Sequence, residues 1–377
     1  MGNKKNMRIG IDARMFSSAF TGVGRYTFEL ITHLAQFDTE NEYLIFLNYP
    51  EYKRFKPPAK NFQKCLAGAK HYSLGEQTRF LLVLLRAQLD LMHFTHFNAP
   101  LFYRRPCVVT IHDLTLSFFP GKKMTKWLHR FSYYRILHSI VARAQKIIAV
   151  SKNTKKDILG IYHLQNDKVK VIPNGVGQEF KKKPKAEILK KTREKYDIKD
   201  DFLLYTGVWR DHKNVIGLIK SFELLKRRGF PGLLIITGRE NPIYPEVKEK
   251  VVKSNFHNSI KLIGLVSEKE LNALYHLARV YVFPSFYEGF GLPILEAFAA
   301  GTPVAASNTS SIPEVCEGQA ILFDPYCVED MAEKIFMIWQ DKSLRQEFIA
   351  GGKKQSKKFS WEKMAKETWE VYRSLRE

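Results

Sequence analysis

The sequence predicts an α/β protein built from parallel, doubly wound sheets. Short runs rich in valine, isoleucine and leucine recur along the whole chain, and the segments between them are long enough to form helices. Parallel strands are covered by helices on both faces, so they are encoded as nearly continuous apolar runs of this kind. The chain of 377 residues exceeds the length of one ordinary core, and we expect two domains of about 150–200 residues.

The expected strands fall into two series. In the first half of the chain we expect them at residues 8–12, 43–47, 91–94, 107–112, 146–150 and 169–172. In the second half we expect them at residues 202–206, 233–237, 260–263, 280–283, 303–306 and 320–323. A glycine- and proline-containing turn at 173–177 and a lysine-rich stretch at 181–185 separate the two series. This composition predicts a hinge at 173–184 between domains that span residues 1–172 and 185–358.

Positive charge is concentrated in the first of these domains. The formal net charge is +22, and residues 1–172 hold 27 Lys and Arg against 11 Asp and Glu. No acidic residue lies between Asp113 and Asp157, where we expect a helix from Lys122 to Lys146 with interleaved aromatic and basic residues. Two interpretations stay open: a solvated helix face, or a surface that meets an anionic bilayer. Charge alone would also allow a nucleic-acid partner, but no nucleic-acid-binding motif accompanies it, and we expect none.

Several features favour a cytoplasmic protein that is soluble or peripheral to the membrane. The first residues are too polar for a secretory signal, and the longest apolar run, residues 80–85, is too short to span a bilayer. The four cysteines are scattered without a paired motif, which fits a reducing compartment.

The most informative segment is residues 284–296, with the sequence PSFYEGFGLPILE. It follows an expected strand and leads into an expected helix at 292–300. Gly289 and Gly291 let the backbone approach a ligand and leave amide N–H groups at a helix N-terminus, where a phosphate or a polar sugar can bind. Glu288 and Glu296 each supply a carboxylate that can accept hydrogen bonds from a pair of hydroxyl groups. The simpler alternative is a structural strand–turn–helix unit with two unrelated glutamates.

Two sites in the first half carry further candidates. Gly22 and Gly24 follow the first strand and open a helix, where paired glycines either cradle a phosphate or only permit a tight turn. His112 and Asp113 end an expected strand, at the edge where α/β sheets bind their ligands. A lone histidine in this position is otherwise structural.

One loop in the second half is basic. Lys213 follows the first strand of the second domain, and Arg210 and His212 stand just before it. A lysine there can compensate the negative charge of a phosphate group. A basic loop in a basic protein is the alternative explanation.

The segment 284–296, with its continuations AGTPV at 300–304 and IPEV at 312–315, resembles the donor-sugar motif of the retaining glycosyltransferases of family 4. The resemblance extends over essentially the whole chain. It implies the GT-B fold, in which two Rossmann-like domains face each other across a cleft and close on the substrates. The N-terminal domain would take the acceptor and the C-terminal domain the nucleotide-sugar donor. The last helix, within residues 359–377, would cross back to pack on the N-terminal domain.

The resemblance also implies roles for the candidate residues of the donor site. Glu288 would hold sugar hydroxyls, Glu296 would hold the ribose hydroxyls, and Lys213 would bind the diphosphate. Many members have an arginine immediately before this lysine, and we expect Arg210 to substitute for it. Further donor contacts are implied for Gly22, Gly24, Gly289, Phe290, Gly291, Leu292 and, through backbone recognition of the base, Val266.

Three residues of the first domain receive roles near the reacting centre. In the family, a histidine at the position of His112 contacts the donor sugar. We expect Asp113 and His96, which both end strands of this domain, on the acceptor side.

Within the family, the segments GIDAR at 10–14, TGVGRY at 21–26 and WRDHKN at 209–214 are most similar to bacterial mannosyltransferases. We therefore expect a retaining hexosyltransferase that uses GDP-mannose, with a UDP-sugar as the alternative donor. The expected acceptor is a lipid-linked or lipopolysaccharide-type glycan at the inner face of the cytoplasmic membrane. No Asp-x-Asp motif is present, so neither a metal nor another cofactor is expected. The remaining alternatives are an epimerase or phosphorylase of the same fold, and a non-catalytic subunit that binds a sugar nucleotide or docks on a membrane.

Overall fold

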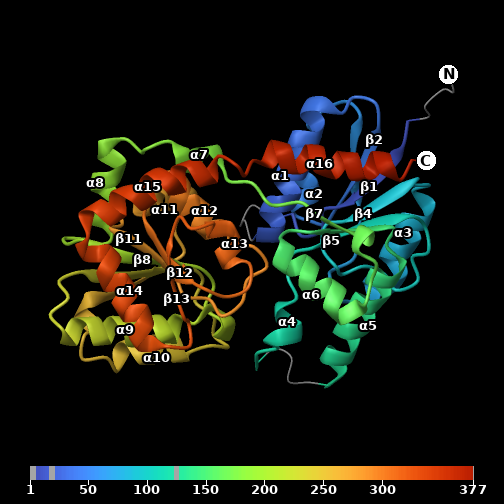
Figure 1. Ribbon diagram of the computed structural model, residues 1–377. Coiled ribbons are helices and arrows are strands. Elements are labelled where there is room, and N and C mark those ends of the chain that lie inside the picture. The colour runs from blue at the N-terminus through green and yellow to red at the C-terminus, as the bar shows by residue number, and fades with distance from the viewer. Residues whose placement is uncertain (1–5, 17–21, 123–126, 377) are drawn as a thin grey trace. The chain divides into compact units, whose positions relative to one another are not determined.

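The computed structural model describes residues 6–16, 22–122 and 127–376 (Figure 1). The chain forms two compact units. The first comprises Met1–Leu114, Met124–Gly175 and Ser360–Glu377, and the second comprises Thr115–Lys123 and Val176–Phe359. Apart from the short segment that begins at Thr115, the main chain passes from the first unit to the second after Gly175 and returns after Phe359.

The first unit is built on a parallel sheet of seven strands in the order β3-β2-β1-β4-β5-β6-β7. The strands are short and apolar, and β4 and β5 are buried over their whole length. Their bounds are β1 Arg8–Asp12, β2 Glu42–Leu47, β3 Phe62–Leu66, β4 Leu91–Phe94, β5 Cys107–Ile111, β6 Lys146–Ala149 and β7 Val169–Val171.

Helices connect these strands and cover the sheet. In α1, Tyr26, Leu30 and Leu34 recur every four residues and are fully buried, so one face of the helix packs on the unit. A π-helical segment, Glu76–Phe80, leads into α3. The α-helices of this unit are α1 Gly22–Phe37, α2 Glu51–Arg54, α3 Leu81–Arg86, α5 Trp127–Arg143, α6 Lys152–Tyr162 and α16 Trp361–Ser374.

The last helix, α16, belongs to the first unit and packs against α1 (Figure 1). The Trp369 indole N–H donates a hydrogen bond to Asp38 at 2.8 Å, and its ring meets Phe37 edge-on. The Tyr372 hydroxyl is 2.6 Å from Nδ1 of His93, which lies in β4. The end of the chain is thus anchored to the first sheet by buried polar contacts as well as by apolar packing.

The second unit is built on a parallel sheet of six strands in the order β10-β9-β8-β11-β12-β13. Its core joins β8 and β9 to the helices α9 and α14, and the rings of Phe230 and Trp339 pack there with centroids 4.5 Å apart. The strands are β8 Phe202–Thr206, β9 Leu233–Thr237, β10 Ile260–Gly264, β11 Val280–Phe283, β12 Val304–Ser307 and β13 Ile321–Phe323. The helices are α4 Thr115–Phe118, α7 Gln178–Lys181, α8 Ala186–Lys195, α9 Val215–Arg227, α10 Glu246–Val252, α11 Glu268–Leu277, α12 Leu292–Ala300, α13 Ile312–Cys316, α14 Val328–Gln340 and α15 Lys342–Ser356.

The parallel α/β architecture confirms the predicted fold class, with two local differences. Strand β3 was not predicted, because Gln63 and Lys64 interrupt its apolar pattern at the edge of the sheet. The single helix predicted from Lys122 to Lys146 is wrong at its C-terminal end. Helix α5 ends at Arg143, and Lys146 begins β6, because the buried Ile147 and Ile148 pair with β5.

The start of α16 lies close to the backbone at Gly175, and this close packing can be tested. A Cβ atom at Gly175 would lie 2.1 Å from the backbone nitrogen of Trp361, so we predict that Gly175→Ala destabilises the unit by about 1–3 kcal/mol. Gly160 is an exposed position within α6 with open space around it, and Gly160→Ala should stabilise the unit by about 0.5–1 kcal/mol. Urea unfolding of both variants measures the two effects. A Gly175→Ala protein as stable as the wild type would contradict the close approach.

Candidate functional site

Loops after two neighbouring strands of the second sheet bring together two predicted residues. Lys213 lies in the 3-10 turn Asp211–Lys213 after β8, and Glu288 follows β11, which pairs with β8. The Nζ atom of Lys213 is 2.6 Å from Oε1 and 2.8 Å from Oε2 of Glu288. The two side chains are largely buried, with 21% and 13% of their surface exposed. An ion pair therefore stands at the carboxyl edge of the sheet, where ligands of α/β proteins bind.

Backbone contacts hold the loops that carry this ion pair. The Phe286 amide donates to the carbonyl oxygen of His212 at 2.8 Å and so ties the loop after β11 to the loop after β8. The Glu288 amide donates to the Ser310 hydroxyl at 2.9 Å, and the Ser311 hydroxyl donates to the Glu288 carbonyl oxygen at 2.9 Å. Neither serine was predicted as a site residue. The signal that could have marked them is their place directly before the IPEV segment.

The turn between the two glutamates requires glycine at one position. Gly291 has a φ of +116° and stands at the N-cap of α12, directly before Leu292. The first N–H groups of a helix have no acceptor within the helix, and they favour an anion at its N-terminus. The side chain of Phe290, which follows Gly289, is buried against Phe359, with ring centroids 5.7 Å apart. Phe290 can therefore serve a ligand through its backbone.

Glu296 is the second glutamate of the motif and is half-buried on α12. Its Oε2 atom accepts a hydrogen bond of 2.9 Å from the hydroxyl of Tyr275, which lies in α11. Nothing in the sequence pattern marked Tyr275. The two glutamates are thus held by different partners, Glu288 by a cation and Glu296 by a phenol.

Arg210 and Val266 are less closely associated with the ion pair of Lys213 and Glu288. Arg210 is exposed, whereas His212, at the position where an arginine is common in the family, is buried. Val266 is half-buried two residues beyond β10. Among the described residues, no side-chain hydrogen bond or ion pair joins either of them to Lys213 or Glu288.

In the first unit, Gly22 and Gly24 occupy the start of α1, as predicted. Gly22 is exposed and Gly24 is buried. The Nε atom of Arg25 is 3.0 Å from Glu29, so its charge is compensated within the helix. Thr21, which precedes the glycines in the motif, lies outside the described residues.

His112 directly follows β5 and has a fixed tautomer. Its Nε2 atom is 2.8 Å from the carbonyl oxygen of Thr95, which can only accept, so Nε2 carries the proton. Its ring meets Tyr26 edge-on with centroids 4.9 Å apart. Burial lowers the pKa of His112, although the bond to Thr95 and the charge of Asp113 act in the opposite direction. The imidazole is therefore neutral near pH 7 and carries its lone pair on Nδ1.

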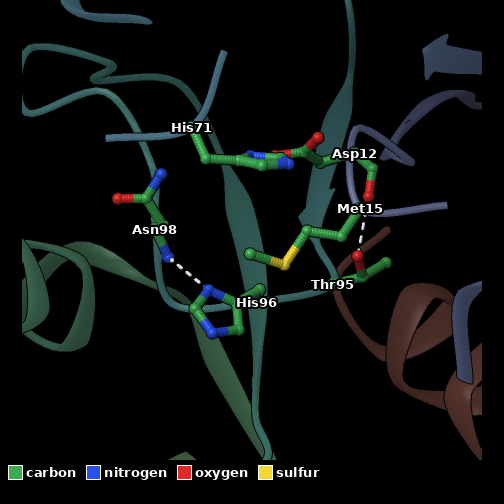
Figure 2. Close-up of a pocket in the computed structure, with 6 residues that line it drawn as sticks. All are labelled: Asp12, Met15, His71, Thr95, His96 and Asn98. Carbon is green, nitrogen blue, oxygen red and sulfur yellow. Dashed lines mark hydrogen bonds between the residues drawn. The ribbon is translucent and has the colours of Figure 1, made fainter. Parts of the chain in front are cut away.

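His96 lines a small pocket in the first unit, together with Asp12, Met15, His71, Thr95 and Asn98 (Figure 2). Its Nδ1 atom accepts a hydrogen bond of 3.3 Å from the Asn98 amide. Burial, with His112 and His71 nearby, lowers the pKa of His96 to about 3. The pKa of His71 is also lowered by burial. The two rings thus offer uncharged nitrogen atoms to this pocket.

A buried ionic cluster adjoins the pocket. The guanidinium of Arg14 donates to Asp12 at 2.8 and 2.7 Å and to Glu76 at 2.8 Å. Asn98 donates to the same oxygen of Glu76 at 2.6 Å. Burial alone would raise the pKa of Asp12, but the charge and hydrogen bonds of Arg14 outweigh it, and the pKa is lowered. Glu76 was not predicted as a site residue, because nothing in the sequence of its π-helical segment links it to Asp12 and Arg14.

Among the described residues, no three His, Cys, Asp or Glu side chains are grouped so that they could hold a metal ion. No helix among those described is both long and apolar enough to cross a bilayer.

Comparison with known proteins matches most of the chain to two family models. The model described as "Glycosyl transferases group 1" matches residues 188–355, and the model described as "Glycosyltransferase Family 4" matches residues 20–180. The first covers the loops of Lys213 and Glu288, and the second covers Gly22, Gly24 and His112.

Several of the relatives are named as mannosyltransferases. The chain is 29% identical to O-antigen chain mannosyltransferase B of Escherichia coli, over 94% of this chain and 96% of that protein. It is 30% identical to the serotype-specific mannosyltransferase WbdA of E. coli over 58% of this chain, which corresponds to 27% of that longer protein. Among solved structures, HepE of Anabaena in complex with UDP and glucose has a TM-score of 0.76 and 16% identity, and the match covers 98% of this chain and 100% of that chain. The structural likeness shows the GT-B fold.

Proposed function

The chain belongs to the group 1 glycosyltransferases of family 4, and we propose that it transfers mannose from GDP-mannose to a lipid-linked or lipopolysaccharide-type glycan with retention of configuration. The observation that carries the proposal is the pairing of Lys213 with both carboxylate oxygens of Glu288 beside the N-terminus of α12. The similarity to O-antigen mannosyltransferase B supports the choice of mannose. A UDP-sugar is the second candidate donor, because HepE was solved with UDP and glucose.

In this proposal, the diphosphate binds to basic side chains and backbone N–H groups of the second unit. Lys213 and the amide N–H groups of Gly291 and Leu292, at the N-terminus of α12, stabilise the negative charge that grows as the bond between sugar and diphosphate breaks. Arg210, which is exposed near the same loop, adds positive charge. Glu288 accepts hydrogen bonds from sugar hydroxyls once Lys213 has a phosphate partner. Glu296 binds the ribose hydroxyls, and the backbone near Val266 binds the base.

The first unit contributes hydrogen-bond acceptors and a close approach of its backbone. The Nδ1 lone pair of His112 accepts a hydrogen bond from a hydroxyl of the donor sugar, and the glycines at 22 and 24 let the backbone approach the donor. Asp113 and His96 belong to the acceptor side. An oxygen of the leaving diphosphate takes the proton of the acceptor hydroxyl on the face from which the diphosphate departs. The old C1–O bond breaks and the new one forms on the same face, which retains the configuration.

The ion pair leads to a test that separates binding from catalysis. In Glu288→Gln, a diphosphate no longer competes with a carboxylate for Lys213, so GDP should bind about fivefold more tightly, equivalent to about 1 kcal/mol. Turnover with GDP-mannose should nevertheless fall by about 10²–10³, because a preorganised contact to the sugar is lost. Lys213→Ala should weaken GDP binding and lower turnover together. Calorimetric titration and initial rates measure both quantities.

A second ion pair of the same unit supplies the matched control. The Nζ atom of Lys250 is 3.0 and 2.8 Å from the two oxygens of Glu223, and their side chains are 30% and 10% exposed. Glu223→Gln should change neither GDP binding nor turnover. If Glu288→Gln behaves like this control, the assigned donor site is wrong.

The reaction itself gives the decisive test of the proposed function. With GDP-mannose and a lipopolysaccharide-type glycan acceptor, NMR of the product should show an α-linkage, the configuration of the donor. Activity should persist in the presence of a chelator, because Lys213 and the α12 amides supply the electrophilic groups. A β-linked product, or complete inactivation by the chelator that added Mg²⁺ reverses, would refute the mechanism. Turnover of UDP-sugars alone would transfer the proposal to the second candidate donor.

We also propose that α5 docks the first unit on an anionic membrane. Trp127, Phe131 and Tyr134 are 71%, 58% and 39% exposed and follow one face of the helix, with Arg130 and Arg135 exposed among them. Aromatic rings suit the membrane interface, and arginines are attracted to its negative charge. Two of the lysines in this basic segment, Lys123 and Lys126, lie outside the described residues. Lys122 belongs to the second unit and is paired there with Glu246.

The docking surface predicts a salt-dependent membrane affinity. Arg130→Gln with Arg135→Gln should weaken binding to anionic vesicles by about 2 kcal/mol, because each basic residue near such a surface contributes about 1 kcal/mol. Transfer to a lipid-linked acceptor should fall, while transfer to a short water-soluble acceptor should survive. Vesicle co-sedimentation at increasing salt measures the affinity, and the exposed pair Lys190→Gln with Lys191→Gln on α8 is the control. Equal losses in both double variants would mean that only net charge matters.

A further inference from the structure

A chain of buried hydroxyl groups ends at Glu296. The Tyr275 hydroxyl is 2.9 Å from Oε2 of Glu296 and 3.2 Å from Oγ1 of Thr206. The same Oγ1 atom is 3.1 Å from the hydroxyl of Tyr281. These residues come from four different elements of the second unit, α12, α11, β8 and β11 (Figure 1). Tyr275 and Tyr281 are fully buried, and Thr206 is 7% exposed.

The hydrogen bonds between these hydroxyl groups can be donated in one direction only, toward Glu296. A carboxylate accepts, so the single phenolic proton of Tyr275 is donated to Glu296. The oxygen of Tyr275 must then accept from Thr206, whose own oxygen must accept from Tyr281. The three hydroxyl dipoles are thus aligned toward the carboxylate, an arrangement in which each bond strengthens the next. Burial, and then the charge of Glu296, raise the pKa of Tyr275 well above its ordinary value, so the phenol keeps its proton.

Tyr275 is itself firmly held. Its ring packs edge-on against Phe180 and against Tyr281, with centroids 5.7 and 5.3 Å away. Its backbone carbonyl oxygen accepts a hydrogen bond of 2.6 Å from the hydroxyl of Thr302. A donor on a rigid ring fixes the rotamer of the glutamate that it contacts, and this removes rotamer entropy that a ligand would otherwise have to overcome.

We infer that Tyr275 is a positioning residue that orients Glu296 toward the ribose and so makes the donor site selective for ribonucleotides. The inference rests on the proposed function, because it takes the ribose as the ligand of Glu296. One carboxylate oxygen is held by the phenol, and the carboxylate is presented to the two neighbouring hydroxyls of the ribose in one orientation. A nucleotide that lacks these hydroxyls gains nothing from that orientation.

The test compares GDP with 2′,3′-dideoxy-GDP by calorimetric titration. The wild type should prefer GDP, and Glu296→Ala should abolish the preference. Tyr275→Phe should reduce the preference about tenfold, because a hydrogen bond to a charged group is lost, while the affinity for 2′,3′-dideoxy-GDP stays unchanged. In turnover assays, Tyr275→Phe should raise the KM for the donor and leave kcat nearly as it was, because the ribose is bound equally in the ground and transition states. UDP and 2′,3′-dideoxy-UDP provide the same comparison for the alternative base.

Tyr281→Phe is the matched control. It removes a hydroxyl from an equally buried tyrosine of the same chain, but that hydroxyl contacts Thr206 and not Glu296. It should keep most of the preference for GDP. If Tyr275→Phe does not fold, Thr206→Val replaces it, because valine has the shape of threonine and removes the donor to Tyr275; a smaller loss of the preference is then expected.

The outcomes separate this inference from the proposal on which it rests. A wild type without a preference for GDP would refute the ribose role of Glu296 and, with it, the role of Tyr275. A preference that Glu296→Ala abolishes but Tyr275→Phe or its Thr206→Val replacement leaves intact would overturn the inference alone. So would an equal loss in Tyr275→Phe and Tyr281→Phe, since it would mark a general effect of packing.

Discussion

The ion pair between Lys213 and Glu288 is the interaction around which the second unit organises its candidate site. It joins residues 75 positions apart in the chain. It can form because β8 and β11 are neighbours in the sheet, although β9 and β10 lie between them in the sequence. Each member compensates the other's charge where both are largely buried, which avoids the cost of an isolated buried charge. A diphosphate would give Lys213 a second anionic partner, and sugar hydroxyls would give Glu288 neutral donors in place of the ammonium group.

Sheet topology explains how short loops assemble this arrangement. In a parallel sheet, the carboxyl ends of all strands meet at one edge. The loops after β8, β11 and β12 therefore converge, and they supply Lys213, Glu288 and Ser310 respectively. The strand and helix on either side of the central turn fix its backbone, and the left-handed conformation of Gly291 directs the chain into α12. Hydrogen bonds between these loops therefore help to fix the candidate site.

Much of this could be predicted from local sequence, and the rest depends on contacts between distant segments. The buried strands were predicted from their apolar runs. Strand β3 was not predicted, because polar residues interrupt its apolar pattern at the sheet edge. Glu288 and Lys213 were identified one by one, each from its own motif. Their pairing could not be predicted without the strand order. Tyr275 and Glu76 carry no local signal at all, because a buried hydroxyl or carboxylate is recognised by its partners, which lie elsewhere in the chain.

The two units also differ in the charge that their buried polar groups offer to a ligand. In the first, His112 and His96 have lowered pKa values and face their surroundings as neutral rings, and the ionic groups Asp12, Arg14 and Glu76 compensate one another. Neutral rings can accept hydrogen bonds from hydroxyls but cannot attract a phosphate. In the second, a lysine is paired with a glutamate close in sequence to a helix N-terminus, and both the lysine and the N-terminus attract phosphate. This difference fits the proposed substrates, since a diphosphate needs positive charge, whereas the hydroxyl groups of a sugar need hydrogen-bond acceptors of fixed orientation, which a neutral imidazole or a carboxylate can supply.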